Sequence, residues 1–216
     1  MWPIGADCAL QLRKPDMTHI IAPAKLTLSL KVIGVREDGF HLIDAEMVSL
    51  ELHDVLTITE GEMGMSVSGP FASGVPTDDS NLVTRALQLC GKTAHIRIEK
   101  NIPHGGGLGG GSSDAAAVLR WAGYSDYVAA SRLGADIPFC MHGGRAHVTG
   151  IGEILEPLPH VAREITLVVP PFGVSTPAVY KAFDSLHAQH DGPNDLEPAA
   201  IAVEPRLAQW RDRIRE

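Results

Sequence analysis

The sequence predicts a mixed fold of strands and helices that is organised around a phosphate-binding loop. An alternation of apolar and polar residues over 94–99 is typical of a strand, a run of glycines follows between 105 and 111, and an alanine-rich helix begins near Ser112. Glycines let backbone N–H groups approach a ligand, and a helix N-terminus adds unpaired N–H donors and the positive end of a dipole. The order of strand, glycine loop and helix therefore predicts a site for a phosphate group.

Other interpretations of the glycine run are weaker. Gly105, Gly107 and Gly110 fit the spacing of a dinucleotide-binding loop, but Pro103 and its neighbours separate the strand from the glycines, unlike the tight turn of that motif. The chain contains no sequence with the Walker spacing. A flexible linker is disfavoured, because linkers are rarely flanked by an apolar strand and a strongly helix-forming run.

The elements before the loop are mostly strands. Residues 19–32 are rich in β-forming residues, and residues 25–30 alternate as a half-buried strand does. The segments that follow are a turn at 36–39, a strand at 45–52, a turn at 53–54, a strand at 55–59 and a helix at 81–90 that Asp78, Asp79 or Ser80 caps.

The elements after the loop alternate between helices and strands. The pattern predicts helices at 112–121 and 124–133, a break at 134–138, strands within 145–158, a short buried strand at 165–169 that two prolines end, and helices at 176–190 and 206–216. His187 and His190 lie on one predicted helix without a cluster of other ligands, so we interpret them as surface residues and not as a zinc site.

Composition narrows the class of protein. The chain has 216 residues, 44% of them hydrophobic, which is enough for one domain or one and a part. A net charge of -8 argues against nucleic-acid binding. Three widely spaced cysteines indicate reduced thiols and a cytoplasmic protein, and no segment has the apolar length to cross a membrane. Residues 1–17 are expected to be a disordered extension, with Met17 an alternative start.

Four motifs in order give the chain a resemblance to the GHMP small-molecule kinases. They are Pro-Ala-Lys-Leu at 23–26, Asp-Gly-Phe-His at 38–41, the glycine loop, and Leu-Gly-Ala-Asp-Ile-Pro-Phe at 133–139. The resemblance implies an α+β fold: a domain like the second domain of ribosomal protein S5 over 18–158, in which the loop contributes to a left-handed βαβ crossover, and the start of a ferredoxin-like domain over 159–216.

The resemblance assigns the catalytic pair to Lys25 and Asp136. Asp136 corresponds to the aspartate that accepts the proton of the substrate hydroxyl or orients it for attack. Lys25 corresponds to the neighbouring lysine, a cation that keeps the carboxylate ionised and lowers the cost of forming an alkoxide. Without the family, Asp136 would be a cap after the helix that ends at Leu133, and a lysine in an alternating strand would face solvent.

For the nucleotide, the resemblance implies ATP with Mg²⁺ and no dedicated metal site; the hydroxyl of Ser112 or Ser113 would help to hold phosphate or Mg²⁺. Asn81 and Lys100 resemble contacts to the adenosine, although Asn81 and Asp79 could equally cap the following helix. The resemblance therefore implies the following ATP-binding residues: Asn81, Lys100, Pro103, Gly105, Gly106, Gly107, Leu108, Gly109, Gly110, Gly111, Ser112 and Ser113.

The motif at 38–41 resembles the branch of the family whose alcohol substrate carries a cytidine diphosphate and which serves non-mevalonate isoprenoid synthesis. His41 would hydrogen-bond the cytosine and Phe40, where tyrosine is usual, would stack on it. Thr176, Pro177, Tyr180 and Lys181 resemble the segment that closes on the cytidine from the far side. Alternatives are a kinase for another small alcohol, such as mevalonate or homoserine, and a nucleotide-binding remnant without turnover.

The chain departs from the family at two further places. Thr27 stands where asparagine is common, and the third glycine-rich motif is missing before Glu216. The second departure predicts a partial C-terminal domain whose apolar faces at 165–169 and on the helix from Thr176 are exposed. We therefore expect poor solubility and low activity.

Overall fold

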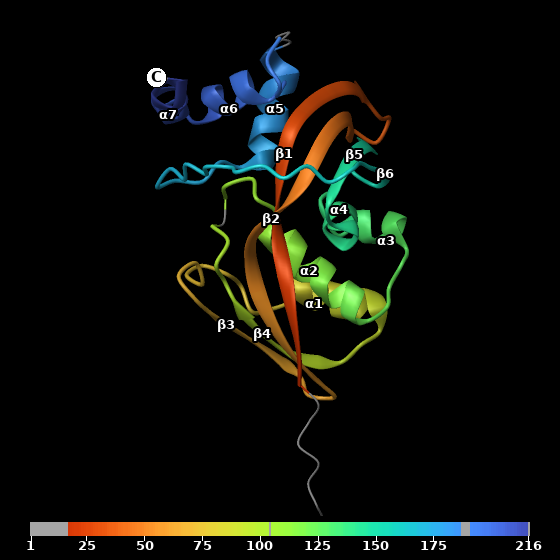
Figure 1. Ribbon diagram of the computed structural model, residues 1–216. Helices are drawn as coiled ribbons and strands as arrows, with labels where there is room; N and C mark the ends of the chain where they lie inside the picture. Colours follow the sequence, from red (N-terminus) through yellow and green to blue (C-terminus); the bar gives the residue numbers. More distant parts are fainter. Residues whose placement is uncertain (1–16, 104, 187–190, 216) are drawn as a thin grey trace, which may run out of the picture.

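A computed structural model describes residues 17–103, 105–186 and 191–215 (Figure 1). The elements are, in order, β1 (Met17–Val35), β2 (His41–Glu60), β3 (Gly64–Ser68), α1 (Leu82–Cys90), β4 (Ala94–Glu99), α2 (Gly110–Trp121), α3 (Tyr127–Ser131), α4 (Ile137–His142), β5 (Arg145–Gly150), β6 (Ile154–Pro157), α5 (Thr176–Leu186), α6 (Glu197–Val203) and α7 (Arg206–Arg215). The mixture of helices with one sheet confirms the predicted fold class. The predictions for residues 1–16, for His187 and for His190 lie outside the described residues.

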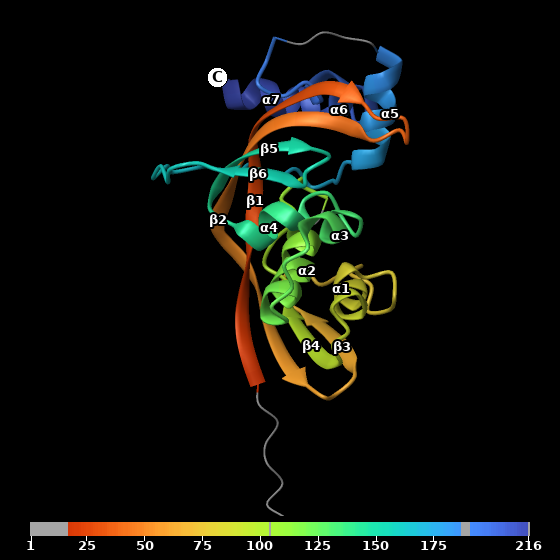
Figure 2. The same ribbon diagram turned by 90° about the vertical axis from the view of Figure 1, so that its right-hand side faces the viewer.

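The sheet is built on the long antiparallel hairpin of β1 and β2 (Figures 1 and 2). Along β2, residues 55–60 pair with β4 and residues 43–48 pair with β5, both antiparallel. The glycine loop follows β4, so it lies in the connection that runs through α2, α3 and α4 to β5. The other strands extend the sheet, with β3 parallel to β4 and β6 antiparallel to β5.

A β-bulge in β1 turns Lys25 toward the interior. The register of β1 against β2 shifts between Pro23 and Lys25, and the consecutive residues Ala24 and Lys25 are both buried. In a regular strand, neighbouring side chains point to opposite faces, so an inserted residue is needed to bury two in succession. This is why Lys25 does not face solvent, as simple alternation would have it.

The core lies between the sheet and the helices α1 and α2, which cover the same part of it (Figure 2). Leu56 and Ile58 of β2, Ile96 and Ile98 of β4, and Leu119 of α2 are at most 1% exposed. The alanines of α2 are fully buried, because small side chains let this helix approach the sheet closely. The packing fixes α2, and with it the position of the glycine loop at its N-terminus.

Several predicted elements need correction. Residues 45–59 form one continuous strand within β2 instead of two strands with a turn at 53–54, because Asp54 is buried and bonded inside the fold. The predicted helix at 124–133 is only Tyr127–Ser131, and the predicted break runs into α4. The cap of α1 is Asn81, whose side chain accepts a hydrogen bond from the Val83 amide, and not an earlier residue.

The predicted buried strand at 165–169 is also wrong. The chain from 158 to 175 contains no strand, and Ile165, Val168 and Val169 are 37%, 42% and 45% exposed. Among the described residues, no backbone-to-backbone hydrogen bond involves residues 160–173. An apolar run adopts a strand only when another strand pairs with it, and here none does. The domain boundary at 158 stays a prediction.

In the part of the chain that the structure describes, every helix is too short or too polar to cross a bilayer.

We predict that this extended segment makes the protein associate. Unpaired backbone groups beside exposed valine and isoleucine favour pairing with another chain. Light scattering after size-exclusion chromatography should show concentration-dependent oligomers, and the double variant Ile165→Lys, Val168→Lys should shift them toward the monomer. Ile33→Lys, at an exposed site on β1, is the control and should leave the oligomers unchanged. A monodisperse monomer with a sharp thermal transition would contradict the prediction.

Candidate active site at the glycine loop

The glycine loop is fastened to β1 at Lys25. The Lys25 amide donates to the carbonyl of Leu108 at 2.9 Å. Gly109, the N-cap residue of α2, has a φ of 66°, and a Cβ there would lie 2.7 Å from Cγ of Lys25. Only glycine combines this left-handed backbone with so close an approach. The loop therefore closes directly over the stem of Lys25.

Lys25 and Asp136 face each other across this contact. Nζ of Lys25 lies 3.2 Å from Oδ2 of Asp136, and it also donates to the Thr27 hydroxyl at 3.2 Å. The Lys25 side chain is 10% exposed, whereas that of Asp136 is 31% exposed. Asp136 occupies the N-cap position of α4, but its side chain makes no capping hydrogen bond. The carboxylate is thus paired with a lysine and remains accessible to a ligand, and the catalytic role of the two residues stays a prediction.

The two serines of the loop have different environments. Ser113 is fully buried and its hydroxyl donates to the carbonyl of Pro23 at 2.6 Å, so that proton ties α2 to β1. Ser112 is half-buried in the first turn of α2, and its oxygen faces Gly134, where a Cβ would lie 3.6 Å away. Of the two hydroxyls predicted to help hold phosphate or Mg²⁺, that of Ser113 is thus occupied by the Pro23 carbonyl, and the role of Ser112 stays a prediction.

A buried cluster of charges supports the loop from below. Nζ of Lys100 donates to Oδ2 of Asp54 and, at 2.6 Å, to Oδ2 of Asp114, and all three side chains are at most 4% exposed. Asp54 also accepts the amides of Asn101 and Ile102, which fixes the chain that leaves β4. These bonds disfavour the predicted contact of Lys100 with ATP. Neither carboxylate had a role in the sequence analysis, and only the polarity of Asp54 within a β-rich run could have indicated one.

Asp114 is the residue of this cluster whose charged form is least well stabilised. Its Oδ1 is buried and has no hydrogen-bond partner among the described residues. Burial raises the pKa of Asp114 to about 7, because the attraction of Lys100 offsets only part of the desolvation and the charge of Asp54 adds to it. The pKa of Lys100 is raised overall. Desolvation by burial lowers this pKa, but the charges and hydrogen bonds of Asp114 and Asp54 raise it by more.

Asn81 is occupied by its capping role. Its Oδ1 accepts from the Val83 amide at 2.9 Å, and its Nδ2 donates to the carbonyl of Pro76 at 2.7 Å. The side chain is nearly buried. Of the two interpretations left open for Asn81, the structure favours the cap over an adenosine contact. Asp79 is exposed and does not cap α1.

The second half of the candidate site lies where β2 begins. Nε2 of His41 lies 2.6 Å from Oδ1 of Asp184, and the His41 ring packs against that of Tyr180, with centroids 4.6 Å apart and planes tilted by 32°. Phe183 meets the same ring edge-on at 6.2 Å. Three side chains of α5 therefore contact the His41 ring. The structure brings together His41 and Tyr180, which are far apart in sequence; Asp184 and Phe183 are functional candidates that the sequence analysis missed.

The other predicted substrate residues lie around this contact. Phe40 is 56% exposed, at a turn where the Asp38 carboxylate accepts the Phe40 amide. Thr176 and Pro177 form the first turn of α5, and Lys181 is exposed on the same helix. The structure thus leaves Phe40 free to stack on a ligand and places the three α5 residues near Tyr180.

A groove of about 970 Å³ runs from the loop to the C-terminal helices. Its walls are Pro103 and residues 105–108 on one side and Trp210 with other apolar residues of α6 and α7 on the other. Residues 167–174 form its floor and touch the loop: Cα of Gly173 would lie 3.0 Å from a Cβ at Gly105, and the Val174 amide donates to the Gly105 carbonyl. The volume of the groove is at the upper end of the range usual for small-molecule sites. Among the described residues, no three histidine, cysteine or acidic side chains gather as a metal site.

Comparisons with known proteins show what the chain is similar to. A family model described as GHMP kinases N terminal domain matches residues 81–144. The chain is 44% identical over 218 residues to a 4-diphosphocytidyl-2-C-methyl-D-erythritol kinase of Paracoccus denitrificans, covering 90% of this chain and 78% of that protein. It is 38% identical over 228 residues to the kinase of the same name from Cereibacter sphaeroides, covering 90% and 81%. It also resembles a crystal structure of 4-(cytidine 5'-diphospho)-2C-methyl-D-erythritol kinase, with a TM-score of 0.66 and 33% identity, covering 92% of this chain and 82% of that one.

We predict that Gly109→Ala destabilises the fold more than Gly107→Ala does. Both glycines have positive φ, but a Cβ at 109 would strike the Lys25 stem whereas nothing lies within 4 Å at 107. The conformational strain of about 1–2 kcal/mol is shared, and the clash should cost about 1–3 kcal/mol more. Urea unfolding measures the difference. Equal losses in the two variants would show that the loop does not close on Lys25.

A second prediction concerns pH. Because the folded state raises the pKa of Asp114 to about 7, it binds a proton that the unfolded state releases near 4, and stability from this group falls as pH rises through that window. The free energy of unfolding of the wild type, relative to Asp114→Asn, should fall by about 2–3 kcal/mol between pH 5 and 8. Urea titrations across this range test it, and comparison with the variant subtracts the titrating groups that Asp114 does not contact. A constant difference would contradict the raised pKa.

Proposed function

The chain belongs to the GHMP kinase family and, within it, to the 4-diphosphocytidyl-2-C-methyl-D-erythritol kinases, and from this premise we propose that it transfers the γ-phosphoryl group of ATP to the 2-hydroxyl of that cytidyl alcohol. The reaction would serve isoprenoid precursor synthesis. The observation that carries the proposal is the Lys25–Asp136 pair, 3.2 Å apart, at the mouth of the glycine loop.

Phosphoryl transfer requires positioning and charge stabilisation more than covalent chemistry by the protein. The accessible carboxylate of Asp136 would accept a hydrogen bond from the substrate hydroxyl, orient its oxygen for in-line attack and receive the proton. The ammonium of Lys25 would stabilise the negative charge that develops on that oxygen. Thr27, which stands where asparagine is common in the family, accepts a hydrogen bond from the same ammonium. Its role would be to orient the Lys25 side chain.

The phosphates would lie on the loop and on the N-terminus of α2. Most residues there are glycines, so no side chain covers their backbone amides. The positive end of the α2 dipole also lies at this point. The donor set suits Mg²⁺, which binds a few protein oxygens together with phosphate oxygens: the Ser112 hydroxyl and the Asp136 carboxylate are the protein oxygens closest to this role. The ion would neutralise phosphate charge when bound.

The cytidine would bind where α5 meets β2. If the Nε2 proton of His41 is donated to Asp184, its Nδ1 remains an acceptor that suits the exocyclic amine of cytosine. Exposed Phe40 and the ring of Tyr180 offer faces for stacking. Thr176, Pro177 and Lys181 would close the site from α5.

We predict that the protein phosphorylates 4-diphosphocytidyl-2-C-methyl-D-erythritol with Mg·ATP and that Asp136→Asn lowers kcat on the order of 10²–10⁴-fold, because the amide cannot accept the proton. Mass spectrometry of the product measures both rates. Asp212→Asn, which alters an exposed carboxylate on α7, is the matched control and should retain full activity.

The same assay separates the alternatives. Mevalonate and homoserine are offered in parallel, and preferential phosphorylation of either would overturn the cytidyl substrate. A folded chain that binds ATP but phosphorylates none of the three would overturn the kinase assignment and leave a nucleotide-binding remnant.

A further inference from the structure

We infer that Arg120 is a positioning residue that sets the distance between α4, which carries Asp136, and β1, which carries Lys25. The inference rests on the proposed function, since it assumes that this pair acts on the substrate hydroxyl. It concerns a side chain outside every motif that the sequence analysis identified.

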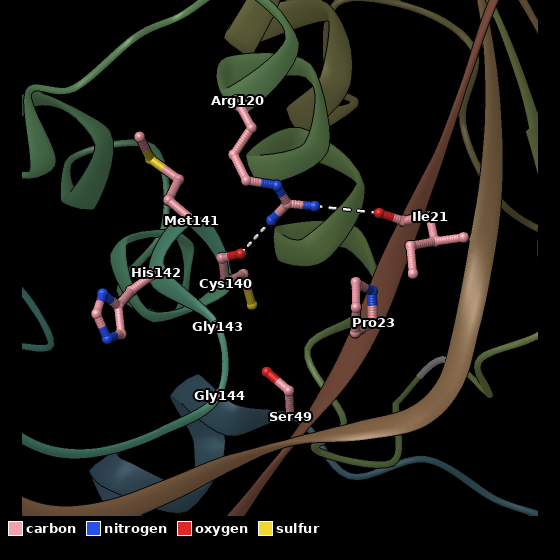
Figure 3. Close-up of a pocket in the computed structure, with 9 residues that line it drawn as sticks. All are labelled: Ile21, Pro23, Ser49, Arg120, Cys140, Met141, His142, Gly143 and Gly144. Atoms are coloured by element: carbon pink, nitrogen blue, oxygen red, sulfur yellow. Dashed lines mark hydrogen bonds between the residues drawn. The ribbon is translucent and has the colours of Figure 1, made fainter. Parts of the chain in front are cut away.

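The guanidinium of Arg120 joins three elements. Arg120 lies in the last turn of α2, and its Nη1 donates to the carbonyl of Cys140 in α4 while its Nη2 donates to the carbonyl of Ile21 in β1 at 3.1 Å. Figure 3 shows the guanidinium between these two carbonyls. A planar group with N–H bonds in fixed directions therefore sets both the distance and the angle between α4 and β1.

Both carbonyls are close in the chain to the catalytic pair. Cys140 follows Asp136 by one helical turn, and its amide donates to the Asp136 carbonyl at 3.0 Å. Ile21 precedes Lys25 by four residues, and between them Pro23 accepts the hydroxyl of Ser113. Helix α2 thus bonds β1 at two points, and it holds α4 by core packing and by the hydrogen bond from Arg120. A shift of α4 would move Asp136 relative to Lys25 while leaving the loop attached to β1.

The bonding of Arg120 favours a geometric role over a charge-pairing one. Among the described residues it has no carboxylate partner, although the protein is acidic overall. Burial lowers the pKa of the guanidinium, which reflects the cost of desolvating a cation without a counter-ion. An apolar residue would leave both main-chain carbonyls without this donor, and the fork of the guanidinium is what lets one side chain bond two separate elements.

A cavity of about 200 Å³ beside the guanidinium makes the bridge testable by chemical rescue. Its walls include Ser49, Cys140 and His142, and the Ser49 hydroxyl points into it (Figure 3). Removing the Arg120 side chain would join its volume to this cavity. A methylguanidinium ion has the shape of the missing group and could bond the same two carbonyls.

The experiment measures steady-state kinetics of Arg120→Ala with and without millimolar methylguanidinium. We expect kcat to fall about 10–100-fold, as for a misplacement of about 1 Å, with little change in the KM for ATP. Methylguanidinium should restore at least a tenth of the lost rate, and ethylammonium, which has the charge but not the planar fork, should not. Arg132→Ala, at an exposed arginine nearby, is the control and should behave as the wild type.

Hydrogen exchange in the ligand-free protein gives a readout that does not depend on activity. The amides of Cys140 and Gly143, which bond within α4, should exchange faster in Arg120→Ala and recover with methylguanidinium. If the wild type transfers no phosphoryl group, the proposed function fails while exchange still decides whether the bridge exists.

Two results would overturn the inference: wild-type kcat in Arg120→Ala, or a loss of kcat that methylguanidinium and ethylammonium restore equally. Arg120→Met keeps the apolar stem and is measured alongside in case the alanine variant does not fold. It should show the same fall in kcat with a KM for ATP like that of the wild type, and a parallel loss of ATP affinity would indicate general damage instead.

Discussion

The close approach of Gly109 to Lys25 is the contact on which the rest of the site depends. A bulge turns Lys25 inward, the loop closes over its stem, and the amide of the same residue bonds Leu108. The ammonium then reaches both Asp136 and the Thr27 hydroxyl, each 3.2 Å away. The strand, the loop and the helix that follows are therefore mutually constrained, and the contact that positions the loop also positions the lysine.

The buried cluster of Lys100, Asp54 and Asp114 is an unfavourable arrangement of charges. Two carboxylates share one lysine in the core, and one carboxylate oxygen has no partner among the described residues. Asp54 fixes the chain that leaves β4 through two backbone amides, and Asp114 lies on the helix that follows the loop. Lys100 therefore connects the two ends of the loop through Asp54 and Asp114.

Local patterns predicted the elements that local sequence determines. The strand at 94–99 coincides with β4, and the glycine loop and α2 follow as expected because their signals are contiguous. The pairing of Lys25 with Asp136 and the approach of His41 to Tyr180 agree with motifs brought from the family. The sequence could not predict features that depend on distant partners. Asp54 resembles a turn residue until Lys100 and two amides are placed around it, and residues 165–169 resemble a strand although no strand pairs with them.

The approach of Gly105 to Gly173 has a consequence for how ligands communicate. The loop touches the segment that leads directly into α5, and the Val174 amide bonds the loop carbonyl. Whatever restricts the loop also restricts the start of the helix that holds His41, and the reverse holds equally. Such coupling is reciprocal by thermodynamic necessity. The nucleotide and the alcohol are thus expected to bind with synergy, each lowering the entropy that the other must lose.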